Sequence, residues 1–278
     1  MSHLVDAAWV IDNLNDPDLI IFDATFVLPT MKRDAAIEFE QTRIAGAQFF
    51  DIDKIADPNS DLPHMVPSPA LFSEMMQKLG LCNHHKVLVY DNSPFLSAAR
   101  AWWLLRFFGK ENIFVLNGGL PSYVKAGGKT DHCKASALPK GDFTASAAQA
   151  ALVLFEDLRK HIENGATLQI IDARPEARFL GEAPEPRAGL RSGHMPGAMN
   201  VPVTKLLDAK TGHLKPKDDL KMLFTEAGLD FDKPAITSCG SGVTAAGLTL
   251  ALAELGKYDI SLYDGSWAEW GASDAPIE

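Results

Sequence analysis

The chain reads Pro234-Ala235-Ile236-Thr237-Ser238-Cys239-Gly240-Ser241-Gly242-Val243-Thr244 just before a helical stretch that runs to about Leu255. This order predicts a strand, a tight loop and a helix, with Cys239 at the end of the strand and beside the helix N-terminus. The two glycines allow the loop to curl so that several backbone N–H groups face one anion. A helix N-terminus favours the deprotonated thiol, which is the reactive form of cysteine. The sequence therefore predicts sulfur chemistry on Cys239.

The two halves of the chain repeat one pattern. Matching features lie 146 to 151 residues apart and pair Asp23 with Asp172, Gly46 with Gly197, Asp91 with Cys239, and Gly119 with Gly265. Such a nearly constant separation predicts a duplicated domain, and each copy has the length of an ordinary domain. We expect the first copy at 1–125, a linker rich in Gly, Pro, Lys and Ser at 126–143, and the second copy at 144–278.

Short apolar runs alternate with helical stretches in both halves. The runs at 87–90 and 170–172 are apolar at consecutive positions, which is typical of strands covered on both faces of a parallel sheet. Helices are expected at 68–79, 97–108, 155–164, 218–227 and 243–255. The expected fold class is α/β, with each half an open parallel sheet that carries helices on both faces. Ligands of such sheets bind at the carboxyl ends of the strands, where Cys239 is expected.

Composition excludes several classes of function. The net charge of −10 and the absence of a Lys/Arg-rich run argue against nucleic acid and anionic membranes as partners. No apolar run approaches the length of a membrane span. The three cysteines, Cys82, Cys133 and Cys239, are widely spaced, so neither a disulfide framework nor a zinc or other metal site is expected. A reducing compartment and an N-terminus without a basic and apolar leader predict a cytoplasmic protein.

The two copies differ at the position where the chemistry is expected. Asp91 stands in the first copy where Cys239 stands in the second. A carboxylate offers no sulfur nucleophile and repels an anion. We therefore expect the first copy to be inactive as a catalyst and to supply a wall of the site, or groups that support it.

Three motifs together resemble the two-domain rhodanese-type sulfurtransferases: Asp172-Ala173-Arg174, Gly193-His194-Met195-Pro196-Gly197-Ala198, and the loop that begins at Cys239. The resemblance covers nearly the whole chain and implies two tandem rhodanese-like domains. The loop looks like that of the 3-mercaptopyruvate sulfurtransferases, because thiosulfate-preferring members carry basic residues where this chain has Gly240 and Ser241. This implies that Cys239 takes the sulfur of 3-mercaptopyruvate as a persulfide, without a separate cofactor. A thiol such as thioredoxin, or cyanide, is the implied acceptor, and pyruvate is released.

The resemblance also implies roles for residues outside the loop. Arg178 and Arg187 match the two arginines with which the family holds the substrate carboxylate, and guanidinium groups bind carboxylates with two parallel hydrogen bonds. Ser241, His64 and Asp53 match a Ser-His-Asp arrangement beside the cysteine, with the last two contributed by the first copy. The remaining loop residues are expected to bind the substrate, and they are Gly240, Gly242, Val243 and Thr244.

Other readings of the same loop remain open. A thiosulfate:cyanide sulfurtransferase differs in its donor, and the ratio of activities on the two donors distinguishes it. A non-catalytic module that relays a persulfide between proteins would show no turnover on small donors alone. Cysteine phosphatases need an arginine where this chain has Ala245, so phosphate would lack a bidentate partner.

Overall fold

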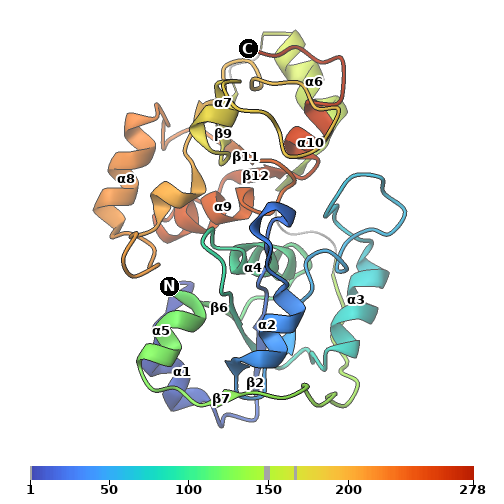
Figure 1. Ribbon diagram of the computed structural model, residues 1–278. Helices are drawn as coiled ribbons and strands as arrows, with labels where there is room; N and C mark the ends of the chain where they lie inside the picture. The colour runs from blue at the N-terminus through green and yellow to red at the C-terminus, as the bar shows by residue number, and fades with distance from the viewer. Residues whose placement is uncertain (1, 147–150, 166–167) are drawn as a thin grey trace.

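The protein is described by a computed structural model that covers residues 2–146, 151–165 and 168–278, and it contains two five-stranded sheets, one in each half (Figure 1). In spatial order, the first sheet contains β1 (Leu4–Val5), β6 (Ile113–Leu116), β5 (Lys86–Tyr90), β2 (Leu19–Asp23) and β4 (Gln48–Phe49). The second contains β8 (Ala151–Val153), β12 (Ile260–Tyr263), β11 (Ala235–Ser238), β9 (Gln169–Asp172) and β10 (Met199–Asn200). All neighbouring strands are parallel, and the two orders correspond strand by strand. The predicted α/β class and duplication are confirmed.

Helices connect these strands in both halves. The first half contains α1 (Ala7–Asn13), the 3-10 turn η1 (Pro29–Met31), α2 (Ala35–Gln41), α3 (Pro69–Lys78), α4 (Ala98–Phe107) and α5 (Gly119–Lys125). The second contains α6 (Phe155–Glu163), α7 (Glu176–Phe179), η2 (Val203–Leu206), α8 (Lys217–Glu226), α9 (Ala245–Glu254) and α10 (Ser266–Trp270).

The five expected helices are α3, α4, α6, α8 and α9, with ends within two residues of the predicted ones. The start of α3 shows why the local sequence was sufficient to predict where this helix begins. The Ser68 hydroxyl accepts a hydrogen bond from the Leu71 N–H (3.3 Å), and Pro69 occupies the first helical position. Both features satisfy or remove backbone donors that a helix leaves unpaired at its N-terminus.

The stretch expected as a linker packs on the first sheet domain. It contains β7 (Thr130–Asp131), which pairs antiparallel with β3 (Arg43–Ile44). Farther along, the N–H groups of Gly141 and Phe143 donate to the carbonyls of Gln77 (2.9 Å) and Leu81 (3.0 Å). These backbone bonds join residues that are far apart in the sequence, so the composition of the stretch does not indicate them.

The two halves meet where α4 packs against α9, between the two sheets (Figure 1). Every residue of α9 is buried, and Arg106 is the one residue of α4 that is partly exposed. A single cluster of buried apolar side chains extends through both halves, from β2 to β12. The halves therefore share a core, which fixes the carboxyl end of β11 against loops of the first half.

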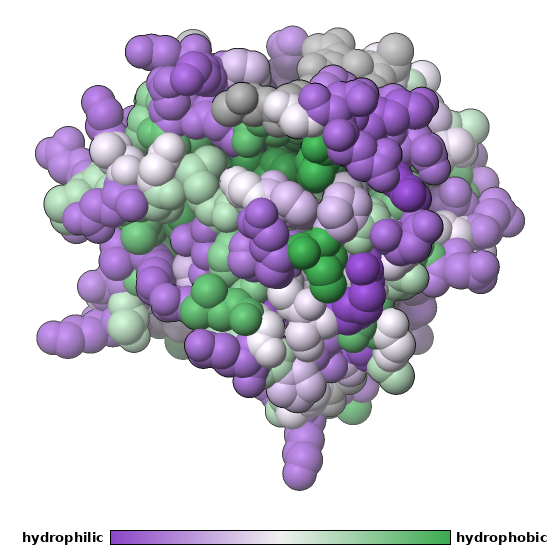
Figure 2. Space-filling model, turned by 90° about the horizontal axis from the view of Figure 1, so that it is seen from above, coloured by the Kyte–Doolittle hydropathy of each residue, from purple (hydrophilic) through white to green (hydrophobic). Residues whose placement is uncertain are grey.

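The face of the molecule seen from above is mostly hydrophilic (Figure 2). Seen from above, hydrophobic residues form separate small patches among hydrophilic ones (Figure 2). Among the described residues, no helix combines the length and the apolar character that a membrane crossing requires.

Asp91 follows β5 just as Cys239 follows β11. Its side chain is nearly fully buried and accepts hydrogen bonds from the Ala98 N–H (2.6 Å) and the Ser97 hydroxyl (3.2 Å). The first copy thus places a carboxylate at the N-terminus of its helix α4, at the position that carries the thiol in the second copy. Burial raises the pKa of Asp91 to about 6, although these hydrogen bonds oppose the rise.

We expect Asp91→Asn to remove a pH-dependent contribution to stability. The raised pKa means that the folded state binds this proton more tightly than the unfolded state. The contribution is therefore complete below pH 3.8 and is lost as the pH rises through 6. The free energy of unfolding of the variant, relative to the native chain, should increase by up to about 3 kcal/mol between pH 4 and pH 7.

Urea unfolding at several pH values measures this difference. Asp12→Asn, a change at an exposed aspartate of α1, is the matched control and should show no such trend. A constant difference between Asp91→Asn and the native chain would contradict the assignment.

Candidate active site

Cys239 lies at the carboxyl end of β11 with only 2% of its surface exposed. The backbone N–H groups of Cys239 and Gly242 both donate to the hydroxyl of Ser266, at 3.1 and 3.2 Å. That hydroxyl donates in turn to the carbonyl of Tyr263 (2.8 Å). One serine from the start of α10 therefore holds both ends of the cysteine loop in place.

The loop leaves several backbone donors available. Within the described residues, no acceptor bonds the N–H groups of Gly240, Ser241, Val243 and Thr244. Of the two loop glycines, only Gly242 has a positive φ (+78°), and a Cβ there would lie 3.0 Å from the Asp264 carbonyl. A set of unpaired N–H groups beside a thiol and a helix N-terminus suits an anionic sulfur.

Ser241, His64 and Asp53 are joined in the structure, although they come from both halves. Nδ1 of His64 lies 3.0 Å from the Ser241 hydroxyl oxygen, and Nε2 lies 2.8 Å from Oδ1 of Asp53. The serine and histidine are buried, whereas the Asp53 carboxylate is largely exposed. In the tautomer with the proton on Nε2, the ring donates to Asp53 and accepts from Ser241. This arrangement can move a proton between the loop and the solvent-facing carboxylate.

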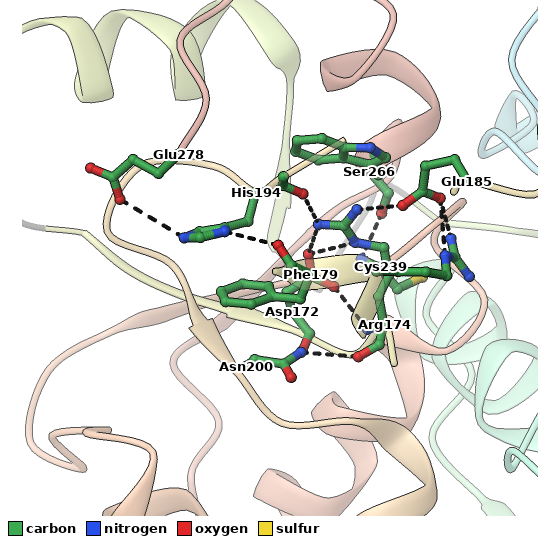
Figure 3. A network of polar contacts seen from close by, with 12 residues as sticks. Asp172, Arg174, Phe179, Glu185, His194, Asn200, Cys239, Ser266 and Glu278 are labelled. Carbon is green, nitrogen blue, oxygen red and sulfur yellow. Dashed lines mark hydrogen bonds and ion pairs between the residues drawn. The ribbon is translucent and has the colours of Figure 1, made fainter. Parts of the chain in front are cut away.

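Arg178 lies beside the cysteine loop. A Cβ on Gly240 would meet its Nη2 at 3.4 Å. Its guanidinium is held by the buried carboxylate of Glu185, which accepts from Nε (3.1 Å) and from Nη2. The same carboxylate pairs with Arg174 (2.8 Å), which also pairs with Asp172 (2.7 Å), and this network reaches the neighbourhood of Cys239 (Figure 3).

Arg187 is not part of this network. It is partly exposed, and within the described residues its guanidinium has neither a hydrogen bond nor an ion pair. It lies in the segment between α7 and β10 that also carries Glu185.

Two buried charged residues beneath the loop were not foreseen from the sequence. Arg100 on α4 pairs through Nη1 with Oδ1 of Asp264 (2.8 Å), and both side chains are buried. Arg100 also donates to the carbonyls of His64 and Gly242, while Asp264 accepts from the Val66 N–H (2.6 Å). The one signal in the sequence is Arg100 near the start of α4, a helix that is apolar apart from this residue and Arg106 in its last turn.

A second group of possible ligands lies on the turn before β5. Ligand atoms of Cys82, His84 and His85 lie within 4.8 Å of one another. However, the Cys82 N–H donates to Nδ1 of His85 (3.0 Å), which leaves the proton of the neutral ring on Nε2. Because neither ring nitrogen of His85 then offers a free lone pair, we assign no metal to this group.

Comparison with known proteins identifies the family. The model of the rhodanese-like domain matches residues 6–126 and again 154–273. The 3-mercaptopyruvate sulfurtransferase of Escherichia coli is 46% identical to this chain, and the alignment covers 100% of this chain and 98% of the relative. The human 3-mercaptopyruvate sulfurtransferase is 38% identical, over 96% of this chain and 91% of the relative. A crystal structure of SseA from Escherichia coli is described as that of a 3-mercaptopyruvate sulfotransferase with the rhodanese fold. It superposes on this chain with a TM-score of 0.87 at 42% identity, and the match covers 97% of this chain and 100% of that one. The chain belongs to the rhodanese family and contains two rhodanese domains in tandem.

Proposed function

We propose that this chain is a 3-mercaptopyruvate sulfurtransferase, which moves the donor sulfur through a persulfide on Cys239 to an acceptor thiol or cyanide and releases pyruvate. One observation carries the proposal: a buried thiol lies at a helix N-terminus, among N–H groups that have no partner within the described residues, in a loop that carries no charged side chain. The full-length similarity to enzymes of this name supports the same donor.

The charges around the loop support mercaptopyruvate as the donor. Its single carboxylate is remote from its sulfur, so the cations that bind it should lie outside the loop. Arg178 lies beside Gly240, and Arg187 has no partner within the described residues, which leaves its guanidinium free to bind a carboxylate. We propose that these two arginines bind the substrate carboxylate, each with the forked geometry that suits two oxygens.

The proposed reaction has two half-reactions. The Cys239 thiolate attacks the donor sulfur, the S–S bond forms, and the C–S bond breaks with its electron pair moving to the pyruvate enolate. The donor thiol proton passes through Ser241 to His64, whose ring Asp53 orients, and returns to the enolate carbon. The N–H groups of the loop residues Gly240, Ser241, Val243 and Thr244 stabilise the persulfide anion, and Gly242 gives the loop its turn.

In the second half-reaction an acceptor thiolate attacks the outer sulfur and restores the Cys239 thiolate. Cyanide accepts the same sulfur as thiocyanate. We propose a protein thiol of the thioredoxin type as the acceptor.

We place the reaction in the reducing cytoplasm, which the three free cysteines favour. We propose that the first domain comprises residues 1–125, that the second comprises residues 144–278, and that residues 126–143 link the two.

Thiosulfate remains the second candidate donor. A relative from Arabidopsis thaliana, 39% identical over 99% of this chain, is named as a thiosulfate/3-mercaptopyruvate sulfurtransferase and as mitochondrial. Thiosulfate is a compact dianion that benefits from cations beside the thiolate, and the loop has none. Mercaptopyruvate should therefore be the better donor.

Cys239→Ser should abolish sulfur transfer from mercaptopyruvate, because a hydroxyl at this position cannot form a persulfide. Pyruvate release and thiocyanate formation both measure the loss. Cys133→Ser, at an exposed thiol in the connecting stretch, is the control and should retain full activity. Retained turnover in Cys239→Ser would end the proposal.

Arg187→Ala should lower kcat/KM for mercaptopyruvate by about 10- to 100-fold, the usual effect of losing a charged hydrogen bond. The effect on thiosulfate should be much smaller, since that donor has no remote carboxylate. Steady-state kinetics with both donors measures the difference. Arg159→Ala, which removes a partly exposed arginine of α6, should change neither value. Equal losses for the two donors would show that Arg187 does not bind the carboxylate.

A further inference from the structure

We propose that Arg100 and Asp264 are positioning residues for sulfur transfer, because their ion pair sets the distance between His64 and Ser241 across the boundary of the two domains. This inference rests on the proposed function of Ser241 and His64 as a proton route. Neither Arg100 nor Asp264 is placed to touch the donor, so both would act through the residues that they hold.

The pair holds the histidine segment from two sides. His64 has a left-handed backbone (φ +62°), which is uncommon for a residue with a side chain and persists only when neighbouring contacts hold it. Arg100 donates to the His64 carbonyl, and Asp264 accepts the N–H of Val66 two residues later (2.6 Å). The two charges therefore bracket the turn that aims the imidazole ring at the cysteine loop.

The same pair touches the loop that carries Ser241. Nη1 of Arg100 donates to the Gly242 carbonyl (3.4 Å), directly after Ser241 in the chain. A Cβ on Gly242 would lie 2.9 Å from Oδ1 of Asp264 and 3.1 Å from Nη1 of Arg100, so the loop is packed against both charges. One guanidinium thus contacts the backbone on both sides of the 3.0 Å contact between His64 and Ser241.

The Arg100–Asp264 ion pair can set the distance between His64 and Ser241 because it joins the two domains. Arg100 comes from α4 of the first domain, where its guanidinium also covers the ring of Trp103 at 5.0 Å. Asp264 follows β12 of the second domain. Since both are buried, solvent does not screen their attraction as it does for surface pairs. A shift of one domain relative to the other would separate Arg100 from Asp264 and His64 from Ser241 at the same time.

A double-mutant cycle between Arg100→Lys and Ser241→Ala tests the inference. The measured rate is that of persulfide formation in a single turnover with mercaptopyruvate. Lysine keeps the charge but has a single nitrogen in place of the two guanidinium nitrogens, of which Nη1 contacts Asp264 and Gly242 and Nη2 contacts the His64 carbonyl. Each single change should slow this step about tenfold or more, as expected when a proton route is lost. In the Ser241→Ala background, Arg100→Lys should change the rate less than about twofold.

Two further measurements separate positioning from a general structural role. Cyanide removal of a preformed persulfide does not use the proton route, so Arg100→Lys should leave that rate unchanged. Arg106→Lys, on the same helix and in contact with the Trp102 ring, should leave both rates unchanged. If Arg100→Lys does not fold, Asp264→Asn enters the same cycle.

Multiplicative effects of the two changes, or an unchanged rate in Arg100→Lys, would overturn the inference while leaving the proposed function intact. Failure of the native chain to form a persulfide from mercaptopyruvate would instead overturn the proposed function. The cycle thus separates the two failures.

Discussion

The buried ion pair between Arg100 and Asp264 is the contact on which the assembled site depends. Taking two charges out of water costs several kcal/mol per ion, and their attraction compensates only when further hydrogen bonds satisfy both groups. Here the carbonyls of His64 and Gly242 and the N–H of Val66 supply such bonds to the two Nη atoms of Arg100 and to Oδ2 of Asp264, whereas Nε of Arg100 has no acceptor within the described residues. Removing one partner of such a pair typically costs about 3–5 kcal/mol, a large fraction of the stability of an ordinary domain. The pair therefore ties the joining of the domains to the geometry around Cys239.

Duplication followed by divergence explains why two similar domains are needed. Both copies end a central strand at the N-terminus of a buried helix, and both place a side chain there. In the first copy the carboxylate of Asp91 bonds the N–H of Ala98 and fills this position. In the second copy the thiol of Cys239 faces N–H groups that remain unpaired within the described residues. The first copy instead contributes His64 and Asp53, which contact Ser241 and each other. In the proposed mechanism one copy thus supplies the nucleophile, and the other supplies two of the groups on the proton route.

The sequence predicted those features that local patterns determine. Consecutive apolar runs indicated parallel strands, and the helical stretches between them were expected within two residues of the observed helix ends. The contact between His64 and Ser241 spans 177 residues, so only the family resemblance pointed to it. The pairing of Arg100 with Asp264 depends on how the domains meet, which no local pattern encodes. The one available sign was an arginine near the start of a helix that is otherwise apolar except for Arg106 in its last turn. The role of Arg187 stays a prediction, because the structure gives it no partner within the described residues.

The central claim is that Cys239 carries the transferred sulfur, and intact-mass spectrometry tests it most directly. The native protein is mixed with mercaptopyruvate in the absence of an acceptor, and its mass is compared before and after, followed by mapping of the modified peptide. The account predicts a gain of one sulfur atom on the peptide that contains Cys239, and its loss on addition of cyanide. No gain, or a gain that maps to Cys82 or Cys133, would contradict it.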